Sequence, residues 1–248
     1  MVIIKTAEEI QAMKKAGMAL ARVINGLTKA VKPGVTTKEL DNLALELMSA
    51  EHVLPAFKGY HGFPANTCTS LNSEVVHGIP GERVLKEGDI LSLDVGVNLD
   101  GFFSDSAVTV AVGKIDARAK KLIQVTKEAL YLGIKQARAH NCLFDISHAI
   151  QEHVESNKFS VVRQFVGHGI GRNLHEEPEI PNFGRPHQGI KLVPGMVLAI
   201  EPMVNMGTWQ TKIDANNWTA LTNDGSLSAH FEHTVLITSG EPGILTQI

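Results

Sequence analysis

The sequence predicts an α+β fold in one domain spanning residues 1–248. Three observations support this prediction: two amphipathic helical patterns open the chain, a hairpin signal lies near its middle, and two further helical patterns precede short apolar strands. Helices that alternate with antiparallel strand pairs favour α+β over a doubly wound parallel sheet. The repeated order of helices followed by strands also indicates a weak internal duplication of architecture.

Capping boxes mark the first two predicted helices. Thr6 to Glu9 opens a helix whose apolar residues follow at helical spacing until Pro33-Gly34 stops the pattern. Thr36 to Glu39 is a second capping box, and we expect its helix to end near His52. Residues 54–82 are rich in glycine and proline, which predicts a loop with short strands.

A hairpin is predicted around Asn98-Leu99-Asp100-Gly101, a turn signal that lies between two apolar segments. Its strands are expected over residues 90–97 and 102–112. Periodicity in the rest of the chain predicts helices at 116–139 and 144–157 and strands near 161–166, 196–204 and 229–238.

Composition narrows the class of function. An apolar fraction of 44% and a charged fraction of 20% are ordinary for a globular protein. The net charge of −3 argues against non-specific binding to nucleic acid or to an anionic membrane. Two cysteines, Cys68 and Cys142, exclude a disulfide-stapled scaffold and favour a reducing cytoplasm. We expect neither a membrane span nor a signal peptide, because apolar runs are short and Glu8 and Glu9 lie near the start.

Two aspartates of the predicted hairpin are expected to face each other. With residues 99 and 100 at the centre of the turn, Asp94 pairs with Asp105. Acids opposite each other on one sheet face repel, and apolar neighbours argue against simple hydration. A shared proton or a bound cation would relieve the repulsion. The alternative is that both acids lie on a solvated face.

Further candidate ligands lie later in the chain. Glu201 and Glu232 stand in apolar, strand-like segments, where carboxylates are seldom left unpaired. His168 lies between two glycines, which we expect to leave room for a ligand. Four carboxylates and a neutral imidazole suit first-row transition metals, and five such ligands suit two divalent ions about 3.5 to 4 Å apart. A shared-proton dyad would explain two of the acids but not four acids and a histidine.

Other residues have weaker individual cases. His77 and His175 lie in turn-rich loops, where a surface turn histidine is an equally good interpretation. The remaining histidines, His230 among them, show no specific pattern. Cys68 is a conceivable nucleophile, but no His/Asn pair that would orient it can be identified, and a buried thiol lining a pocket is the commoner arrangement. The motifs of zincins and P-loop proteins and the nucleophile elbow do not occur in the sequence.

Seven segments spread over the chain carry more specific motifs. They are residues 66–80 (NTCTSLNSEVVHGIP), 89–96 (DILSLDVG), 101–105 (GFFSD), 167–172 (GHGIGR), 175–178 (HEEP), 200–203 (IEPM) and 226–234 (SLSAHFEHT). Together they resemble type I methionine aminopeptidases, which are metal-dependent exopeptidases of the pita-bread family. The resemblance covers essentially the whole chain. Because the sequence contains no zinc-finger extension and no appended N-terminal domain, we expect the short bacterial form.

This resemblance implies a pita-bread fold with pseudo-two-fold symmetric halves and a central curved antiparallel sheet. It also implies a set of metal ligands. Asp94 would bind one divalent ion, His168 and Glu201 would bind a second, and Asp105 and Glu232 would bridge the two. A bridging water would be the nucleophile. Co, Mn, Fe, Ni and Zn are all compatible with these ligands.

The resemblance further implies an aminopeptidase that removes the initiator methionine when the second residue is small. His77 would contact the scissile amide and assist the departing amine, His175 would stabilise the oxyanion, and Glu201 would accept a proton from the attacking water. The expected partners are peptides and nascent chains that begin with methionine, together with the ribosome. The chain is expected to be a cytoplasmic monomer.

The resemblance places a methionine side-chain pocket at Tyr60, Phe63, Cys68, Leu174 and Trp218. Phe63 stands where a tyrosine is common and Leu174 where an aromatic residue is expected, but the pocket remains apolar. A monovalent cation near Asn72 and Ser228 is a further implied feature. Two alternatives remain open: a proline-specific aminopeptidase or dipeptidase on the same fold, and a metal-free peptide-binding module. The first usually carries a large N-terminal domain, and the complete ligand set argues against the second.

Overall fold

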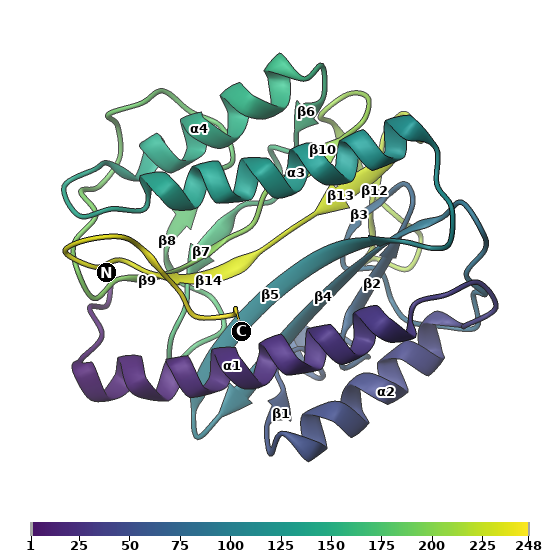
Figure 1. Cartoon of the computed structure of the whole chain (residues 1–248), viewed down its shortest axis with the longest axis horizontal. Coiled ribbons are helices and arrows are strands. Elements are labelled where there is room, and N and C mark those ends of the chain that lie inside the picture. The colour runs from purple at the N-terminus through teal and green to yellow at the C-terminus, as the bar shows by residue number, and fades with distance from the viewer. Residues whose placement is uncertain (1, 248) are drawn as a thin grey trace.

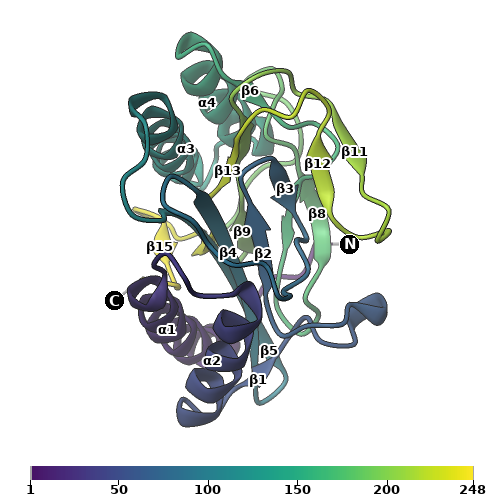
Figure 2. The same cartoon turned by 90° about the vertical axis from the view of Figure 1, so that its right-hand side faces the viewer.

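Two helix pairs and a set of antiparallel strands build the chain (Figure 1). The computed structural model describes residues 2–247. Helices α1 (Ala7–Ala30) and α2 (Thr37–Ala50) form one pair, and α3 (Ala117–Gln136) and α4 (Leu143–Ser156) form the other. All four helices lie on one side of the long strands, as Figure 2 shows. The predicted α+β class is confirmed. No helix within residues 2–247 is long and apolar enough to cross a membrane.

The two predicted capping boxes are present at the starts of α1 and α2. The Thr6 hydroxyl accepts a hydrogen bond from the Glu9 backbone N–H, and the Glu9 carboxylate accepts one from the Thr6 N–H. Thr36 and Glu39 repeat the arrangement. Helix α2 ends at Ala50, and His52 just beyond it has a left-handed backbone with φ of 56°. Helix α3 is shorter than the predicted 116–139, and α4 has the predicted length but begins and ends one residue earlier than expected.

The predicted hairpin forms, but its register differs from the expected one. Strands β4 (Ile90–Leu99) and β5 (Phe102–Ala111) pair so that Asp94 lies opposite Ala107 and Gly96 opposite Asp105. The turn is centred on Asp100 and Gly101, whose φ angles of 52° and 83° are both positive. A two-residue hairpin turn needs positive φ at both centres, which aspartate and glycine adopt more readily than leucine. The expected direct pairing of Asp94 with Asp105 was therefore wrong by two residues.

This two-residue shift leaves both aspartates on the same sheet face. Side chains alternate between faces with a period of two, so a shift of two positions preserves the face and converts a direct neighbour into a diagonal one. The expectation that the two acids share one sheet face therefore holds, and both aspartates line the same cavity.

All strand pairings in residues 2–247 are antiparallel, and they form four sheets. In the first half of the chain, β1 (Leu54–Pro55) and β2 (Cys68–Leu71) flank β4, and β5 also pairs with β4. The five-stranded sheet of the second half has the order β15 (Gly243–Ile244), β14 (His233–Leu236), β9 (Val197–Ile200), β7 (Gly167–Gly169) and β8 (Glu176–Ile180). The two smaller sheets are β13 (Ser228–His230), β10 (Met203–Asn205) and β6 (Ser160–Val161), and β11 (Thr211–Ile213), β12 (Ala220–Thr222) and β3 (Glu74–Val76).

The two halves meet along a short seam between β5 and the start of β14. Ala107 N–H donates to the Glu232 carbonyl at 3.4 Å, and Glu232 N–H donates to the Ala107 carbonyl at 2.9 Å. Each half has its own apolar core, one between α1, α2 and β4 and the other between α3, α4 and the second sheet. The seam brings Asp105 and Glu232, which are distant in sequence, to the same place.

Candidate active site

A cavity of about 200 Å³ lies at the seam, and the described residues that line it come from strands, loops and the short 3-10 helix Tyr60–Gly62. Its polar side holds Asp94 on β4, Asp105 on β5, Glu201 just after β9, and Glu232 between β13 and β14. His168 on β7 completes this group. The five predicted metal ligands therefore line one cavity, although they come from five separate segments of the chain.

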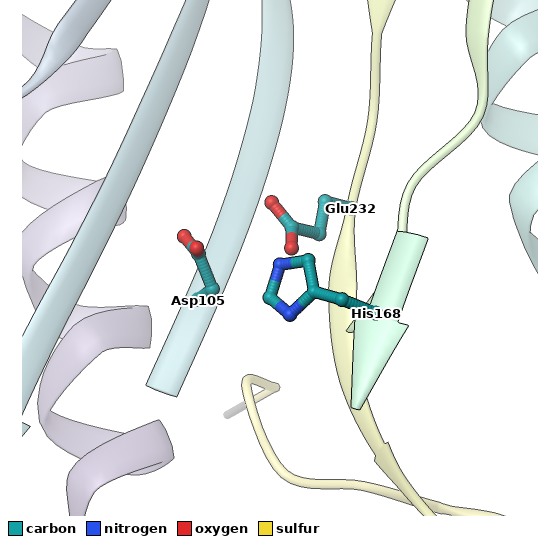
Figure 3. A group of neighbouring side chains, drawn as sticks. All are labelled: Asp105, His168 and Glu232. Atoms are coloured by element: carbon teal, nitrogen blue, oxygen red, sulfur yellow. The ribbon is translucent and has the colours of Figure 1, made fainter. Parts of the chain in front are cut away.

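Three of these side chains form the tightest cluster. Asp105, His168 and Glu232 each offer one donor atom, and these atoms lie within 4.8 Å of one another (Figure 3). The three residues are 4%, 7% and 2% exposed, so water cannot fully hydrate the two carboxylates. Asp94 and Glu201 border the same cavity but lie outside this tightest group.

The chain leaves the acids of this cavity poorly satisfied. Asp94 Oδ1 and Glu232 Oε1 are buried and have no hydrogen-bond partner among the described residues. Burial, reinforced by the neighbouring acids, raises the pKa of Asp94, Glu201 and Glu232 well above their ordinary values. Burial also raises the pKa of Asp105 to about 7. Buried carboxylates that lack partners are expensive, and divalent cations would compensate them. The site therefore fits the divalent metal that the ligand pattern predicts.

His168 is held in a defined tautomer. Its Nδ1 lies 2.9 Å from the Gly169 carbonyl oxygen, which can only accept a hydrogen bond. Nδ1 therefore carries the proton, and the Nε2 lone pair is free on the other side of the ring. Nε2 lies 3.5 Å from Glu201 Oε1, and burial lowers the pKa of His168 to about 3. A neutral imidazole with a free Nε2 is the form that binds a metal.

The glycines beside His168 have a different role from the expected one. A Cβ atom at Gly167 would lie 2.4 Å from the Ala199 carbonyl oxygen, and one at Gly169 would lie 2.2 Å from that of Glu177. The glycines allow β9 and the β8 segment to approach closely, and so fix the position of His168. They make room for neighbouring backbone rather than for a ligand.

His77 and His175 both lie in the wall of the cavity. Burial lowers the pKa of His77 to about 4, with a further effect from His175. Burial also lowers the pKa of His175. The Tyr60 hydroxyl lies 2.7 Å from His175 Nδ1. Both histidines are thus placed beside the carboxylates, although each could equally have been a surface turn residue.

The apolar side of the cavity contains all five residues of the predicted methionine pocket: Tyr60, Phe63, Cys68, Leu174 and Trp218. The Phe63 and Trp218 rings pack edge to face with centroids 5.3 Å apart. Cys68 is buried, and burial with the nearby Asp94 raises the pKa of its thiol well above the usual value. A nucleophilic cysteine needs a lowered pKa, so this environment argues against the cysteine hydrolase alternative.

Asn72 and Ser228 lie next to each other but outside this cavity. Ser228 N–H donates to the Asn72 carbonyl at 2.8 Å. The Asn72 side chain donates to Asp89 and accepts from the Ile90 N–H. A monovalent cation near this pair remains a prediction.

Sequence reasoning missed two residues of the site. His61 also lines the cavity, and His230 lies behind Glu201 with its Nε2 3.5 Å from Glu201 Oε2. The pairing of β10 with β13 places His230 opposite Met203, two residues after Glu201. No local pattern could have indicated this contact, because it depends on the pairing of strands that are far apart in sequence.

Comparison with known proteins agrees with this geometry. The chain matches metallopeptidase family M24 over residues 11–239. It is 55% identical to a methionine aminopeptidase of Clostridium acetobutylicum, covering 99% of each chain, and 51% identical to methionine aminopeptidase 1 of Bacillus subtilis, covering 100% of each. The structure superposes on methionine aminopeptidase from Thermotoga maritima with a TM-score of 0.99 at 50% identity over the full length of both chains.

Prolidase from Pyrococcus furiosus shares the fold, with a TM-score of 0.82 at 22% identity; the match covers 99% of this chain and 66% of the prolidase. The pita-bread fold expected from the sequence is thereby confirmed. At such low identity the likeness to prolidase concerns the fold alone. The family match and the full-length relatives show that the chain belongs to metallopeptidase family M24 and, within it, to the methionine aminopeptidases.

Proposed function

We propose that this protein removes the N-terminal methionine from peptides and nascent chains whose second residue is small. The observation that carries the proposal is the two-sided cavity: four carboxylates and His168 on one side, and an apolar wall that ends in Phe63 and Trp218 on the other. A side chain seated against the apolar wall would bring the amino end of a peptide to the carboxylates.

The four acids and His168 would hold two divalent ions. In this proposal Asp94 would hold one ion, His168 and Glu201 would hold the other, and Asp105 and Glu232 would serve both. When bound, the ions supply an activated water and a Lewis acid that polarises the scissile carbonyl. Co, Mn, Fe, Ni and Zn all suit oxygen and imidazole ligands, and the supply of metal in the cell decides among them.

Three side chains would handle protons and developing charge. The Glu201 carboxylate, ionised when it holds a metal, would accept a proton from the attacking water. His77 and His175 have lowered pKa values and are neutral near pH 7, so each offers one N–H donor. A Tyr60 hydroxyl that donates to His175 Nδ1 leaves the Nε2–H of His175 to stabilise the oxyanion. His77 would contact the scissile amide and the departing amine.

The cavity also suggests the basis of specificity. A methionine side chain is unbranched, and its sulfur packs well on aromatic edges such as those of Tyr60 and Trp218. A charged first residue would find no neutralising partner on this wall. The His77 ring packs edge to face against Phe165 with centroids 5.6 Å apart, which narrows the space beside the scissile bond. We therefore propose that cleavage needs a small second residue.

We also propose where the enzyme acts and in what oligomeric state. It acts as a cytoplasmic monomer with one catalytic domain over residues 1–248, on nascent chains at the ribosome. A monovalent cation near Asn72 and Ser228 belongs to the proposal as well. The names of the relatives support an N-terminal peptide substrate. The oligomeric state of the chain is testable by sedimentation.

The test compares kcat/KM for Met-Ala-Ser, Met-Leu-Ser, Lys-Ala-Ser and Ala-Pro-Ser after metal-free protein has been loaded with each metal in turn. We expect Met-Ala-Ser to be cleaved best, with little cleavage of Met-Leu-Ser and Lys-Ala-Ser. A norleucine peptide should be tolerated, because one methylene in an apolar pocket changes the free energy by only about 1 to 3 kcal/mol. Preference for Ala-Pro-Ser would support the proline-specific alternative, and equal rates would contradict the role of the apolar wall.

A further inference from the structure

The Glu201 carboxylate lies between two imidazole rings. Oε1 is 3.5 Å from His168 Nε2, and Oε2 is 3.5 Å from His230 Nε2. His168 borders the cavity, whereas His230 is absent from the described residues that line it. His230 therefore approaches Glu201 from behind, on the side away from the substrate.

His230 occupies an unusual environment for a buried imidazole. It is 1% exposed, and neither ring nitrogen has a close hydrogen-bond partner among the described residues. An imidazole always carries at least one N–H donor, and leaving such a donor unpaired in the interior is unfavourable. The Glu201 carboxylate, at the edge of hydrogen-bonding distance, is the acceptor within reach of Nε2. Contacts of this kind are often long in the free enzyme and shorten when a site is loaded.

The backbone of His230 is anchored with more precision than its ring. The Thr109 hydroxyl lies 2.8 Å from both the backbone nitrogen and the carbonyl oxygen of His230. Because that hydroxyl donates to the His230 carbonyl, it must accept from the Ser92 hydroxyl, which is also 2.8 Å away. Hydrogen-bonded hydroxyls on β4 and β5 thus fix the backbone position of His230. They thereby also determine the direction from which its ring approaches Glu201.

We infer that His230 is a positioning residue that holds the Glu201 carboxylate by donating its Nε2–H to Oε2. This contact leaves Oε1 directed toward His168 and the cavity. The inference rests on the proposed role of Glu201 as a metal ligand and proton acceptor. Residues that orient metal ligands typically change metal affinity or activity by about 10- to 100-fold when replaced.

The experiment uses His230→Met and His230→Gln in the full chain. Methionine fills a similar volume without a donor, whereas glutamine can place an amide N–H near the position of Nε2. We expect His230→Met to weaken metal affinity, measured by titration of the metal-free protein with Mn²⁺, by about 10-fold or more. It should lower kcat for Met-Ala-Ser with KM changed less than about twofold, because the apolar wall is untouched. His230→Gln should restore both metal affinity and kcat to within about threefold.

A double-mutant cycle with Glu201→Ala separates positioning from general packing. If His230 acts through Glu201, His230→Met should weaken Mn²⁺ affinity less than about threefold in the Glu201→Ala background. An equal loss in both backgrounds, or equal losses for His230→Met and His230→Gln, would overturn the inference. The metal titration needs no substrate, so a failure of the proposed peptidase activity would appear separately, as a loaded wild-type protein that does not cleave Met-Ala-Ser.

Discussion

Asp41 on α2 and Asp105 on β5 are both buried aspartates, and they differ in what surrounds the carboxylate. Asp41 accepts four hydrogen bonds at 2.8–3.0 Å, from the Asn66 N–H and amide and from the Thr67 N–H and hydroxyl. Asp105 accepts a backbone hydrogen bond from its own neighbour Ser106 and lies beside other acids.

This contrast separates two uses of a buried acid. The donors around Asp41 all belong to the chain, so that carboxylate ties α2 to the segment before β2 and is structural. The acids around Asp105 lack such donors, and two of their oxygens have no partner among the described residues. Buried polar groups are nearly always paired, so an unpaired set of acids indicates that the missing partner comes from outside the chain.

The largest effect on activity is expected when one of the acids proposed to contact both metal ions is replaced. Asp105→Asn keeps the side-chain shape but removes a ligand proposed to contact both ions, so kcat/KM for Met-Ala-Ser should fall by about 10³-fold, or about 4 kcal/mol. Glu232→Gln should behave alike. The metal-free Asp105→Asn protein should unfold at no lower a temperature than metal-free wild type, because the change removes a buried acid without a partner. Activity within tenfold of wild type would contradict the assignment.

Chelation should affect the stability of the whole protein nearly as strongly. A ligand present at 100 times its Kd stabilises the folded state by about 2.7 kcal/mol for each site. For a chain of this size, about 1 kcal/mol moves the melting temperature by roughly 2–4 °C, so chelator should lower it by roughly 5–10 °C for one site. Melting curves of loaded protein with and without chelator measure this. Coincident curves would mean that the acids hold no metal that matters for stability.

The effect of Asp41→Asn on stability should not depend on metal. The substitution replaces charge-assisted hydrogen bonds with weaker ones. It also places an amide NH2 group, which is a donor, opposite donors of the chain. Together these effects should destabilise the protein by about 2–3 kcal/mol. The loss should be the same with and without chelator, and metal content measured by mass spectrometry should stay at the wild-type value. A loss of bound metal in Asp41→Asn would show that the two kinds of acid are not independent.

The acids of the cavity also predict a coupling between metal and protons. The raised folded-state pKa values, about 7 for Asp105, mean that the metal-free fold holds protons that an unfolded chain releases near pH 4. These groups therefore make the metal-free fold less stable as the pH rises from about 4 through about 7. A binding metal must displace these protons, so its affinity should rise by about tenfold per pH unit for each proton released. Calorimetry of metal binding in buffers of different ionisation enthalpy counts the protons, and a count of zero at pH 6 would contradict the raised pKa values.

Sequence reasoning recovered the features that local chemistry determines. The capping boxes at Thr6 and Thr36 are complete within four residues, and both form as predicted. The hairpin register was wrong because two adjacent turn centres are possible in Leu99-Asp100-Gly101, and only backbone φ decides between them. The shared face of Asp94 and Asp105 was nevertheless correct, since it depends on parity rather than on exact register.

The parts of the site that could not be predicted depend on strand pairing over long distances. His230 reaches Glu201 because β13 pairs with β10, and Asp105 reaches Glu232 because the two halves join at the seam. The apolar wall around Phe63 and Trp218 followed from the family resemblance rather than from any local pattern. Asp41 showed no sequence signal, because its four donors lie about 25 residues further along the chain.

The smallest expected effect tests the donors of Asp41 one at a time. Thr67→Val removes a single hydroxyl, 2.9 Å from Asp41 Oδ1, while the two backbone N–H donors to that oxygen remain. We expect a loss of about 1 kcal/mol and a melting temperature lower by roughly 2–4 °C. Thr69→Val is the matched control, because its hydroxyl is also buried but has no partner among residues 2–247. Thr69→Val should leave the stability of the protein unchanged or raise it, because valine has the same shape as threonine and lacks the unsatisfied hydroxyl. Equal losses in both variants would mean that burial of a hydroxyl, rather than its bond to Asp41, determines the stability of this region.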